Sequence, residues 1–197
     1  MEQRTEEWFK SRVGRVTASR VGDVMTKIKT GESATRKNYK MQVLAEQLTG
    51  NPTKSFTTEA MQWGIDNEAN ARKLYELVTD QVVTEVGYVS IDDYCGASPD
   101  GLVGEDGLVE IKCPNTAQHI DYLLSKSVPT QYNLQMQMQM WATNRKWCDF
   151  VSYDPRLDAK NQLSIVRVQR DDKLIDEMKK EIKLFVKEIN DLKKQLM

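Results

Sequence analysis

Two acidic residues and one lysine, Asp100, Glu110 and Lys112, have the types and spacing of a metal-dependent hydrolytic site. Glu110 and Lys112 alternate in the segment LVEIKC, so in a strand their side chains share one face. Asp100 precedes Glu110 by nine intervening residues, and a turn at Gly104 to Gly107 can fold its strand back beside Glu110. Two such carboxylates repel each other unless a cation lies between them, and Mg²⁺ binds one or two carboxylates plus substrate phosphate. The lysine can position or deprotonate a metal-bound water, so the set is equipped to hydrolyse a phosphodiester.

The E-x-K element alone has little specificity. Glu181-Ile182-Lys183 repeats it within a segment of helical character that has no Pro-Asp before it. Pro99-Asp100 followed by E-x-K on a strand is a more demanding pattern. From the residues alone, a metal-dependent nuclease and a buried structural salt bridge in an unrelated α/β protein both stay open.

The catalytic set must be positioned by a mixture of strands and helices. Patterns of β-branched and aromatic residues predict strands over 81–89, 108–113, 147–153 and 162–169. Helical spacing predicts helices over 4–12, 38–48, 57–78, 131–143 and 172–196, whereas 27–36 is polar and loop-like and 115–130 is helix or loop.

Two of these helices need comment. Residues 131–143 alternate Gln and Met, but both types favour helices over strands, so we expect a helix on which Gln135 and Gln139 share a face. Residues 172–196 carry an apolar stripe that we expect to pack on the sheet, with an oligomer surface as the alternative.

Length and composition favour one domain over residues 1–197. There is no 18-residue apolar run, so we expect a cytoplasmic protein with no membrane association. Cys95, Cys113 and Cys148 lack C-x-x-C spacing, which favours free thiols over a zinc or iron–sulfur site. His119 is the only histidine, which excludes a metal site with two histidines.

Positive charge is concentrated near the N-terminus. The net charge of the chain is −1, but residues 1–40 hold ten Lys/Arg against five Asp/Glu, and residues 41–170 hold eleven against seventeen. A local basic excess is the footprint expected of a phosphate-binding surface, and a solvated basic face is the alternative.

Three further polar residues have two interpretations each. Arg12 offers a planar fork for a phosphate, and Ser19 offers a hydroxyl near the expected start of a helix. The alternative is an exposed arginine and an N-cap serine. Glu68, taken alone, is interpreted as a surface glutamate of the helix over 57–78.

The motifs together resemble one known family. In order they are W-x-x-x-R-x-G-x-x-T-A-S from Trp8, W-G-x-x-x-E ending at Glu68, S-P-D-G, E-I-K-C-P, Gln135 six residues before Trp141, and Tyr153-Asp154-Pro155-Arg156. This succession resembles the phage λ-exonuclease family, or YqaJ-type viral recombinases, within the PD-(D/E)xK nuclease superfamily. The resemblance implies an α/β fold with a restriction-endonuclease-like core, a central mixed β-sheet flanked by helices, and a long C-terminal helix.

The resemblance also implies an activity. It is an Mg²⁺-dependent, alkaline-type exonuclease that degrades one strand of linear double-stranded DNA from the 5′ end to mononucleotides. Two Mg²⁺ ions per site, with Mn²⁺ as a substitute, are implied. The resemblance further implies a homotrimeric ring that acts on DNA ends with a 5′-phosphate. It implies a phage single-strand annealing protein as partner in homologous recombination, and the bacterial cytoplasm as location. The alternatives are an endonuclease of the same fold and a non-catalytic DNA-end-binding module.

Site roles follow from the resemblance position by position. Asp100 and Glu110 match the principal metal ligands, with Glu68 and the backbone carbonyl of Ile111 as further ligands. Lys112 matches the catalytic lysine, and Gln135 matches a glutamine near the attacking water. The 5′-phosphate pocket is implied at Arg12, Ser19 and Ser98, and a strand-separating wedge at Met61.

Overall fold

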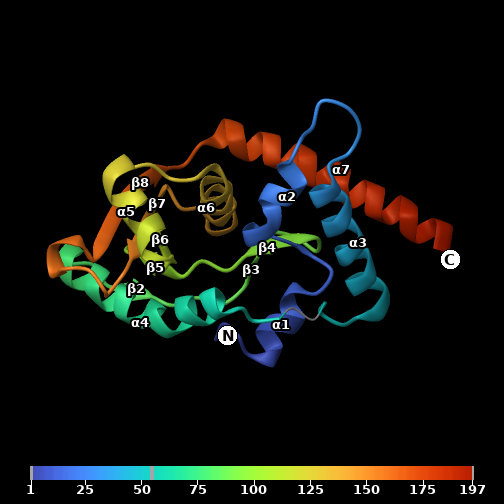
Figure 1. Cartoon of the computed structure of the whole chain (residues 1–197). Helices are drawn as coiled ribbons and strands as arrows, with labels where there is room; N and C mark the ends of the chain where they lie inside the picture. Colours follow the sequence, from blue (N-terminus) through green and yellow to red (C-terminus); the bar gives the residue numbers. More distant parts are fainter. Residues whose placement is uncertain (1, 54–55, 197) are drawn as a thin grey trace.

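A five-stranded mixed sheet forms the centre of the protein (Figure 1). The computed structural model describes residues 2–53 and 56–196. The strand order is β2-β5-β6-β7-β8, and only β6 and β7 are parallel neighbours. The strands are β2 (Val83–Thr84), β5 (Gly101–Val103), β6 (Gly107–Lys112), β7 (Trp147–Tyr153) and β8 (Leu163–Gln169). The expected mixed central sheet is confirmed, and β5 folds back beside β6 through the turn at Gly104.

A second, three-stranded sheet lies beside the first. It consists of β1 (Val16–Thr17), β4 (Cys95–Ala97) and β3 (Val89–Ser90), in that order. The prediction of one strand over residues 81–89 is therefore wrong. The chain leaves the central sheet after Thr84 and joins the second sheet at Val89, with Gly87 in the connection.

Helices cover both faces of the central sheet. They are α1 (Glu6–Arg12), α2 (Val21–Met25), α3 (Ala34–Thr49), α4 (Glu59–Thr79), α5 (Thr116–Ser125), α6 (Thr130–Thr143) and α7 (Asp172–Leu196), with 3-10 turns η1 (Ala18–Arg20) and η2 (Ala159–Asn161). Ala71 and Tyr75 of α4 pack on one face of the sheet, against Val109 and Ile111 of β6. Tyr122 of α5 and Met136 and Met140 of α6 pack on the other face.

Side-chain caps fix several helix starts. The hydroxyls of Thr5, Ser33 and Thr58 accept the amides of Trp8, Arg36 and Met61, and thereby satisfy free donors in the first turns of α1, α3 and α4. The Ser33 cap starts α3 at Ala34, four residues before the predicted position. The helical prediction for residues 131–143 is confirmed by α6.

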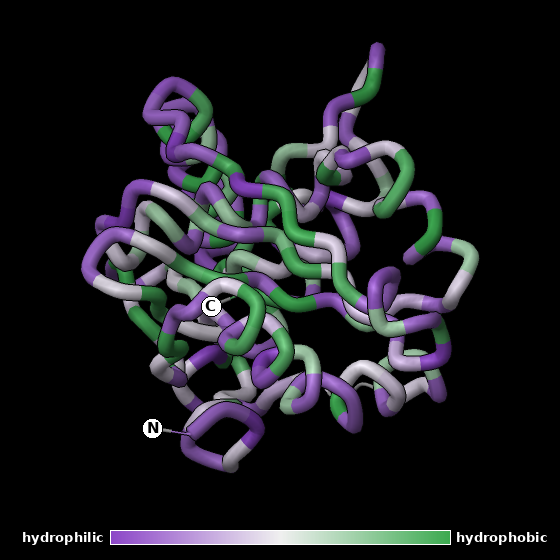
Figure 2. Tube along the Cα trace, turned by 90° about the vertical axis from the view of Figure 1, so that its left-hand side faces the viewer, coloured by the Kyte–Doolittle hydropathy of each residue, from purple (hydrophilic) through white to green (hydrophobic). Residues whose placement is uncertain are grey.

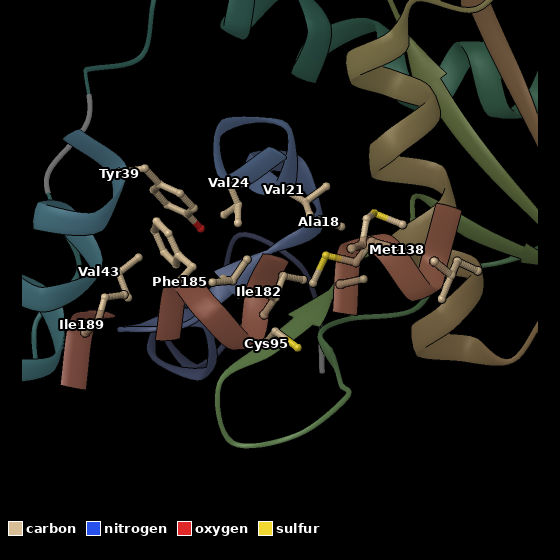
Figure 3. Close-up of a cluster of buried hydrophobic side chains, with 14 of the residues drawn as sticks. Ala18, Val21, Val24, Tyr39, Val43, Cys95, Met138, Ile182, Phe185 and Ile189 are labelled. Atoms are coloured by element: carbon tan, nitrogen blue, oxygen red, sulfur yellow. The ribbon is translucent and has the colours of Figure 1, made fainter. Parts of the chain in front are cut away.

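The largest apolar cluster joins the N-terminal region to the C-terminal helix (Figure 3). Ile182, Phe185 and Ile189 of α7 pack against Tyr39 and Val43 of α3. The same cluster contains Ala18 of η1, Val21 of α2, Cys95 of β4 and Met138 of α6. The sequence predicts that the apolar stripe of α7 packs on the sheet. The stripe packs on helices and on the small second sheet, and no described residue of α7 belongs to the apolar clusters of the central sheet.

Hydrophobic residues gather in the strands at the centre, and the outer loops are mostly hydrophilic (Figure 2). No helix in the described part of the chain combines the length and the apolar composition needed to cross a membrane. The three cysteines are free thiols, as expected.

Candidate active site

A cavity of about 900 Å³ opens at the end of β6. Its walls come from α1, η1, α4, α6 and the ends of β5 and β6. Every residue given a role above lines it: Arg12, Ser19, Met61, Glu68, Ser98, Asp100, Glu110, Ile111, Lys112 and Gln135. Segments more than a hundred residues apart in the sequence thus meet at one place.

The alternation of β6 separates its apolar and charged side chains. Val109 and Ile111 face α4, whereas Glu110 faces α6 and is completely buried. Asp100 lies just before β5, and its Oδ2 accepts the backbone N–H of Ile111 at 2.7 Å. Lys112 forms an ion pair with Glu110. The convergence expected from the spacing of Asp100, Glu110 and Lys112 is therefore present.

Gly101 permits this arrangement. A Cβ at this position would overlap a methyl group of Val83 on β2 and press on Val109 of β6. Only glycine lets β5 lie this close to both side chains. The glycine of the S-P-D-G motif therefore positions Asp100.

Two glutamines of α6 hold Glu110. Oε1 of Glu110 accepts the amide of Gln135 at 2.6 Å, and Oε2 accepts the amide of Gln139 at 2.6 Å. Gln139 is fully buried and was not assigned a role from the sequence. The signal for it was its four-residue spacing from Gln135, which places both amides on one face of α6.

The buried charges shift two pKa values. Burial, followed by repulsion from Glu110, raises the pKa of Asp100 to about 8. Burial acts to lower the pKa of Lys112, but the charges of Glu110 and Asp100 outweigh it and raise that pKa above its usual value. Lys112 is therefore an ammonium group here, and burial favours the neutral form of Asp100.

The donor set fits a hard cation that brings some of its own ligands. Within residues 2–53 and 56–196, no three His, Cys, Asp or Glu side chains lie close enough to form a complete metal cluster. Asp100 and Glu110 supply two carboxylates, and the Ile111 carbonyl can add a third oxygen. Mg²⁺ takes one or two carboxylates and fills its remaining positions with water and phosphate. A cation would also remove the repulsion that raises the pKa of Asp100.

Glu68 lies in the cavity wall, so its interpretation as an ordinary surface glutamate is wrong. It reaches the cavity from α4, and its carboxylate pairs with Arg4 and Arg72. Binding a metal would require Glu68 to exchange at least one of these partners. Its own surroundings in the sequence could not reveal this position, because an isolated glutamate on a helix carries no signal of what faces it. Only the family resemblance placed Glu68 near the site.

Arg12 and two serines form an anion pocket at the side of the cavity. Ser98 Oγ accepts Arg12 Nη1 at 3.2 Å and Trp8 Nε1 at 2.9 Å, and Arg12 Nη2 reaches Ser19 Oγ at 3.5 Å. The guanidinium lies 4.2 Å from the centroid of the Trp8 ring. Burial lowers the pKa of Arg12, although an arginine stays charged at any working pH.

The charge of Arg12 is available to a ligand. Among the ion pairs of the described residues, none involves Arg12. Ser19 lies within η1, before α2 begins at Val21, and it caps neither element. Its hydroxyl thus lies near a helix start and faces Arg12, as expected, whereas the alternative of an N-cap serine is wrong.

Met61 lies in the first turn of α4, at the cavity, and its side chain is half exposed. Two aromatic or charged residues that had no assigned role also line the cavity. Tyr132 of α6 lies with its ring centroid 5.1 Å from Lys112 Nζ, and Arg156 extends from the segment after β7.

Comparison with known proteins identifies the family. Residues 7–146 match the YqaJ-like viral recombinase domain. A crystal structure of an alkaline exonuclease, LHK-Exo, from Laribacter hongkongensis is 46% identical, with a TM-score of 0.91 over 98% of this chain and 96% of that one. LHK-Exo in complex with dAMP matches with the same values. None of the curated proteins compared with the chain matches it.

A more distant structure supports the fold alone. A phage-related exonuclease from Haemophilus somnus 129PT is 18% identical, with a TM-score of 0.78 over 93% of this chain and 96% of that one. The family match, over residues 7–146, spans well over half of the sequence. Both LHK-Exo structures, which are similar to this chain, are of an exonuclease. The chain belongs to the YqaJ-like viral recombinase family.

Proposed function

We propose that the protein is an Mg²⁺-dependent exonuclease that degrades the 5′-ended strand of linear double-stranded DNA to mononucleotides. The observation that carries this proposal is the shared cavity. An anion pocket with an unpaired arginine opens into the same space as Asp100, Glu110 and Lys112. A site for a terminal phosphate beside a site for phosphodiester hydrolysis is what a 5′-exonuclease requires.

The anion pocket would set the polarity of degradation. A terminal phosphate carries nearly two negative charges and can accept hydrogen bonds from Arg12, Ser19 and Ser98. Holding that group fixes which phosphodiester reaches Asp100 and Glu110, so cleavage starts one nucleotide from the end. The similar protein LHK-Exo has been crystallised in complex with dAMP, a deoxynucleoside monophosphate of the kind such cleavage releases.

The side chains divide the chemical work. When bound, Mg²⁺ supplies the charge that activates water and stabilises the leaving oxygen. Asp100, Glu110 and the Ile111 carbonyl would hold the metal, with Glu68 as a further candidate ligand. Gln135 would orient the attacking water, since its amide already lies at Glu110. The Lys112 ammonium would move from Glu110 to the water or phosphate once metal charge neutralises Glu110.

The same proposal includes an assembly and a partner. A homotrimeric ring would bring three copies of the basic residues 1–40 to one channel, so a chain with a net charge of −1 could still retain DNA. Met61 would separate the strands at the cavity mouth. A phage single-strand annealing protein would take up the strand that remains, in the bacterial cytoplasm.

Digestion of defined DNA ends tests the function. We expect linear duplex with 5′-phosphate ends to be degraded faster than duplex with 5′-hydroxyl ends, with Mg²⁺ or Mn²⁺ and not with a chelator. Covalently closed circular duplex should stay intact, and its cleavage would indicate an endonuclease instead. Lys112→Ala should abolish cleavage and keep binding to DNA ends, and cleavage at the parental rate would exclude this active site.

A further inference from the structure

Arg156 lines the cavity but has no part in the machinery described so far. Its Nε and Nη2 donate to Oδ1 and Oδ2 of Asp154 at 2.7 and 2.9 Å. Asp154 is completely buried and also accepts the backbone N–H of Arg156 at 3.0 Å. Two parallel charge-assisted hydrogen bonds to a buried carboxylate fix the plane and direction of the guanidinium.

Trp63 of α4 supports the other side of the arginine. The guanidinium carbon lies 4.4 Å from the centroid of the Trp63 ring, and Trp63 also lines the cavity. Within the part of the chain that the structure describes, Nη1 of Arg156 has no hydrogen-bond partner, and 47% of the side chain is exposed. A rigid guanidinium with free donors can bind an anion with little further loss of side-chain entropy.

Strand order places this arginine opposite the anion pocket. In the sheet, β6 lies between β5 and β7. Ser98, which contacts Arg12, precedes β5. On the other side, Lys112 of β6 lies beside Ser152 of β7, and Asp154 directly follows β7. Glu110 and Lys112 therefore stand between an arginine on the β5 side and an arginine on the β7 side.

We propose that Arg156, held by Asp154 and Trp63, binds a backbone phosphate of the cut strand on the uncleaved side of the scissile bond. This inference rests on the proposed function. A strand with its terminal phosphate at Arg12 and its scissile phosphate at Lys112 continues toward the β7 side of the cavity. Contacts on both sides of the scissile phosphate would hold the strand more firmly in the register that the terminal phosphate sets.

The chain contains a matched arrangement outside the cavity. Arg167 donates through Nε and Nη2 to Asp149, both at 2.8 Å, and lies 3.6 Å from the centroid of the Trp147 ring. Its side chain is 49% exposed, close to the value for Arg156. Arg167 is not among the residues that line the cavity. The two arginines therefore have the same pair of side-chain hydrogen bonds to an aspartate and the same aromatic support, and they differ in that only Arg156 lines the cavity.

The contact between Arg156 and the DNA backbone can be tested by replacing single phosphates of the cut strand with uncharged methylphosphonates. In the Lys112→Ala background, which allows binding without cleavage, we would measure dissociation constants for 5′-phosphorylated duplexes with one methylphosphonate at successive positions of that strand. We expect a position one or two phosphates beyond the scissile bond to weaken binding roughly tenfold. Adding Arg156→Ala should remove that penalty and lower the slope of log Kd against log salt by about one.

The controls keep the outcomes distinct. Arg167→Ala should retain both the penalty and the salt slope. Should Arg156→Ala fail to fold, Arg156→Lys keeps a charge for Asp154 but loses the planar fork, and it should reduce the same penalty. Unchanged penalties at every position in the Arg156 variants would overturn the inference. Digestion by the parental protein is measured in parallel, so a chain that does not degrade linear DNA refutes the proposed function as well.

Discussion

The hydrogen bond from Gln139 to Glu110 allows a sharp test of how the active site is held. Both side chains are fully buried, and the amide nitrogen lies 2.6 Å from Oε2 of Glu110. Gln139→Met keeps the length and helix propensity of the side chain and removes the amide donor together with the amide oxygen. The substitution also repeats a residue type that α6 already contains at every second position from Met136 to Met140.

The expected cost follows from the partners that are lost. A hydrogen bond to a charged group contributes about 1.5–3 kcal/mol. Oε1 of Gln139 has no partner among the described residues, so its removal adds no cost. We therefore expect the free energy of unfolding to fall by about 2 kcal/mol, or about 4–8 °C in Tm for a chain of this size. Because Glu110 also loses its orientation, the rate of cleavage should fall roughly 10- to 100-fold.

Gln137 provides the matched control on the same helix. It is also buried, and it bonds the Gln169 carbonyl at 2.9 Å and the Asp171 amide at 2.8 Å, away from Glu110. Gln137→Met should therefore lower Tm to a similar extent while the cleavage rate per folded molecule stays near the parental value. Parental stability and rate in Gln139→Met, or equal loss of rate in both variants, would show that Gln139 does not position Glu110.

Two further predictions concern pH. Because the pKa of Asp100 is raised to about 8 in the folded protein, the native state binds this proton more tightly than the unfolded chain. In chelator, its contribution to stability should be complete below about pH 4 and decrease as the pH rises toward 8. Asp100→Asn should flatten that slope in thermal melts, and an unchanged slope would contradict the assignment. Arg156 and neighbouring donors outweigh burial and lower the pKa of Asp154 to about 2, so its contribution should be present above about pH 4 and be lost as the pH falls toward 2. Acid unfolding of Asp154→Asn should lack this step, and a wild-type profile in that variant would count against the Asp154–Arg156 pair as its source.

Much of the fold could be predicted because its long elements have strong local patterns. The alternation in β6, β7 and β8 and the stripe of α7 are visible in the sequence, and all are confirmed. The prediction of one strand over 81–89 was wrong because the segment is rich in valine throughout, whereas β2 and β3 are two residues each and belong to different sheets. Pairing with other strands, β5 for β2 and β4 for β3, decides which sheet each strand joins. The residues of the segment itself do not reveal this pairing.

The site shows the same limit. The pairing of β5 with β6 follows from local spacing and a glycine turn, so the meeting of Asp100, Glu110 and Lys112 could be predicted from these residues. Glu68 could not be placed by its own surroundings in the sequence, and only the family resemblance put it near the site. Arg156 received no role from either argument, because its place depends on β7 lying parallel to β6.

The packing of α7 connects two separate parts of the cavity wall. Its stripe from Ile175 to Ile189 completes the cluster that contains Ala18 beside Ser19 and Met138 beside Gln139. None of the described residues that line the cavity belongs to α7. A substitution that weakens this apolar stripe should therefore disturb η1 and α6 together, at a distance from every residue that faces the cavity.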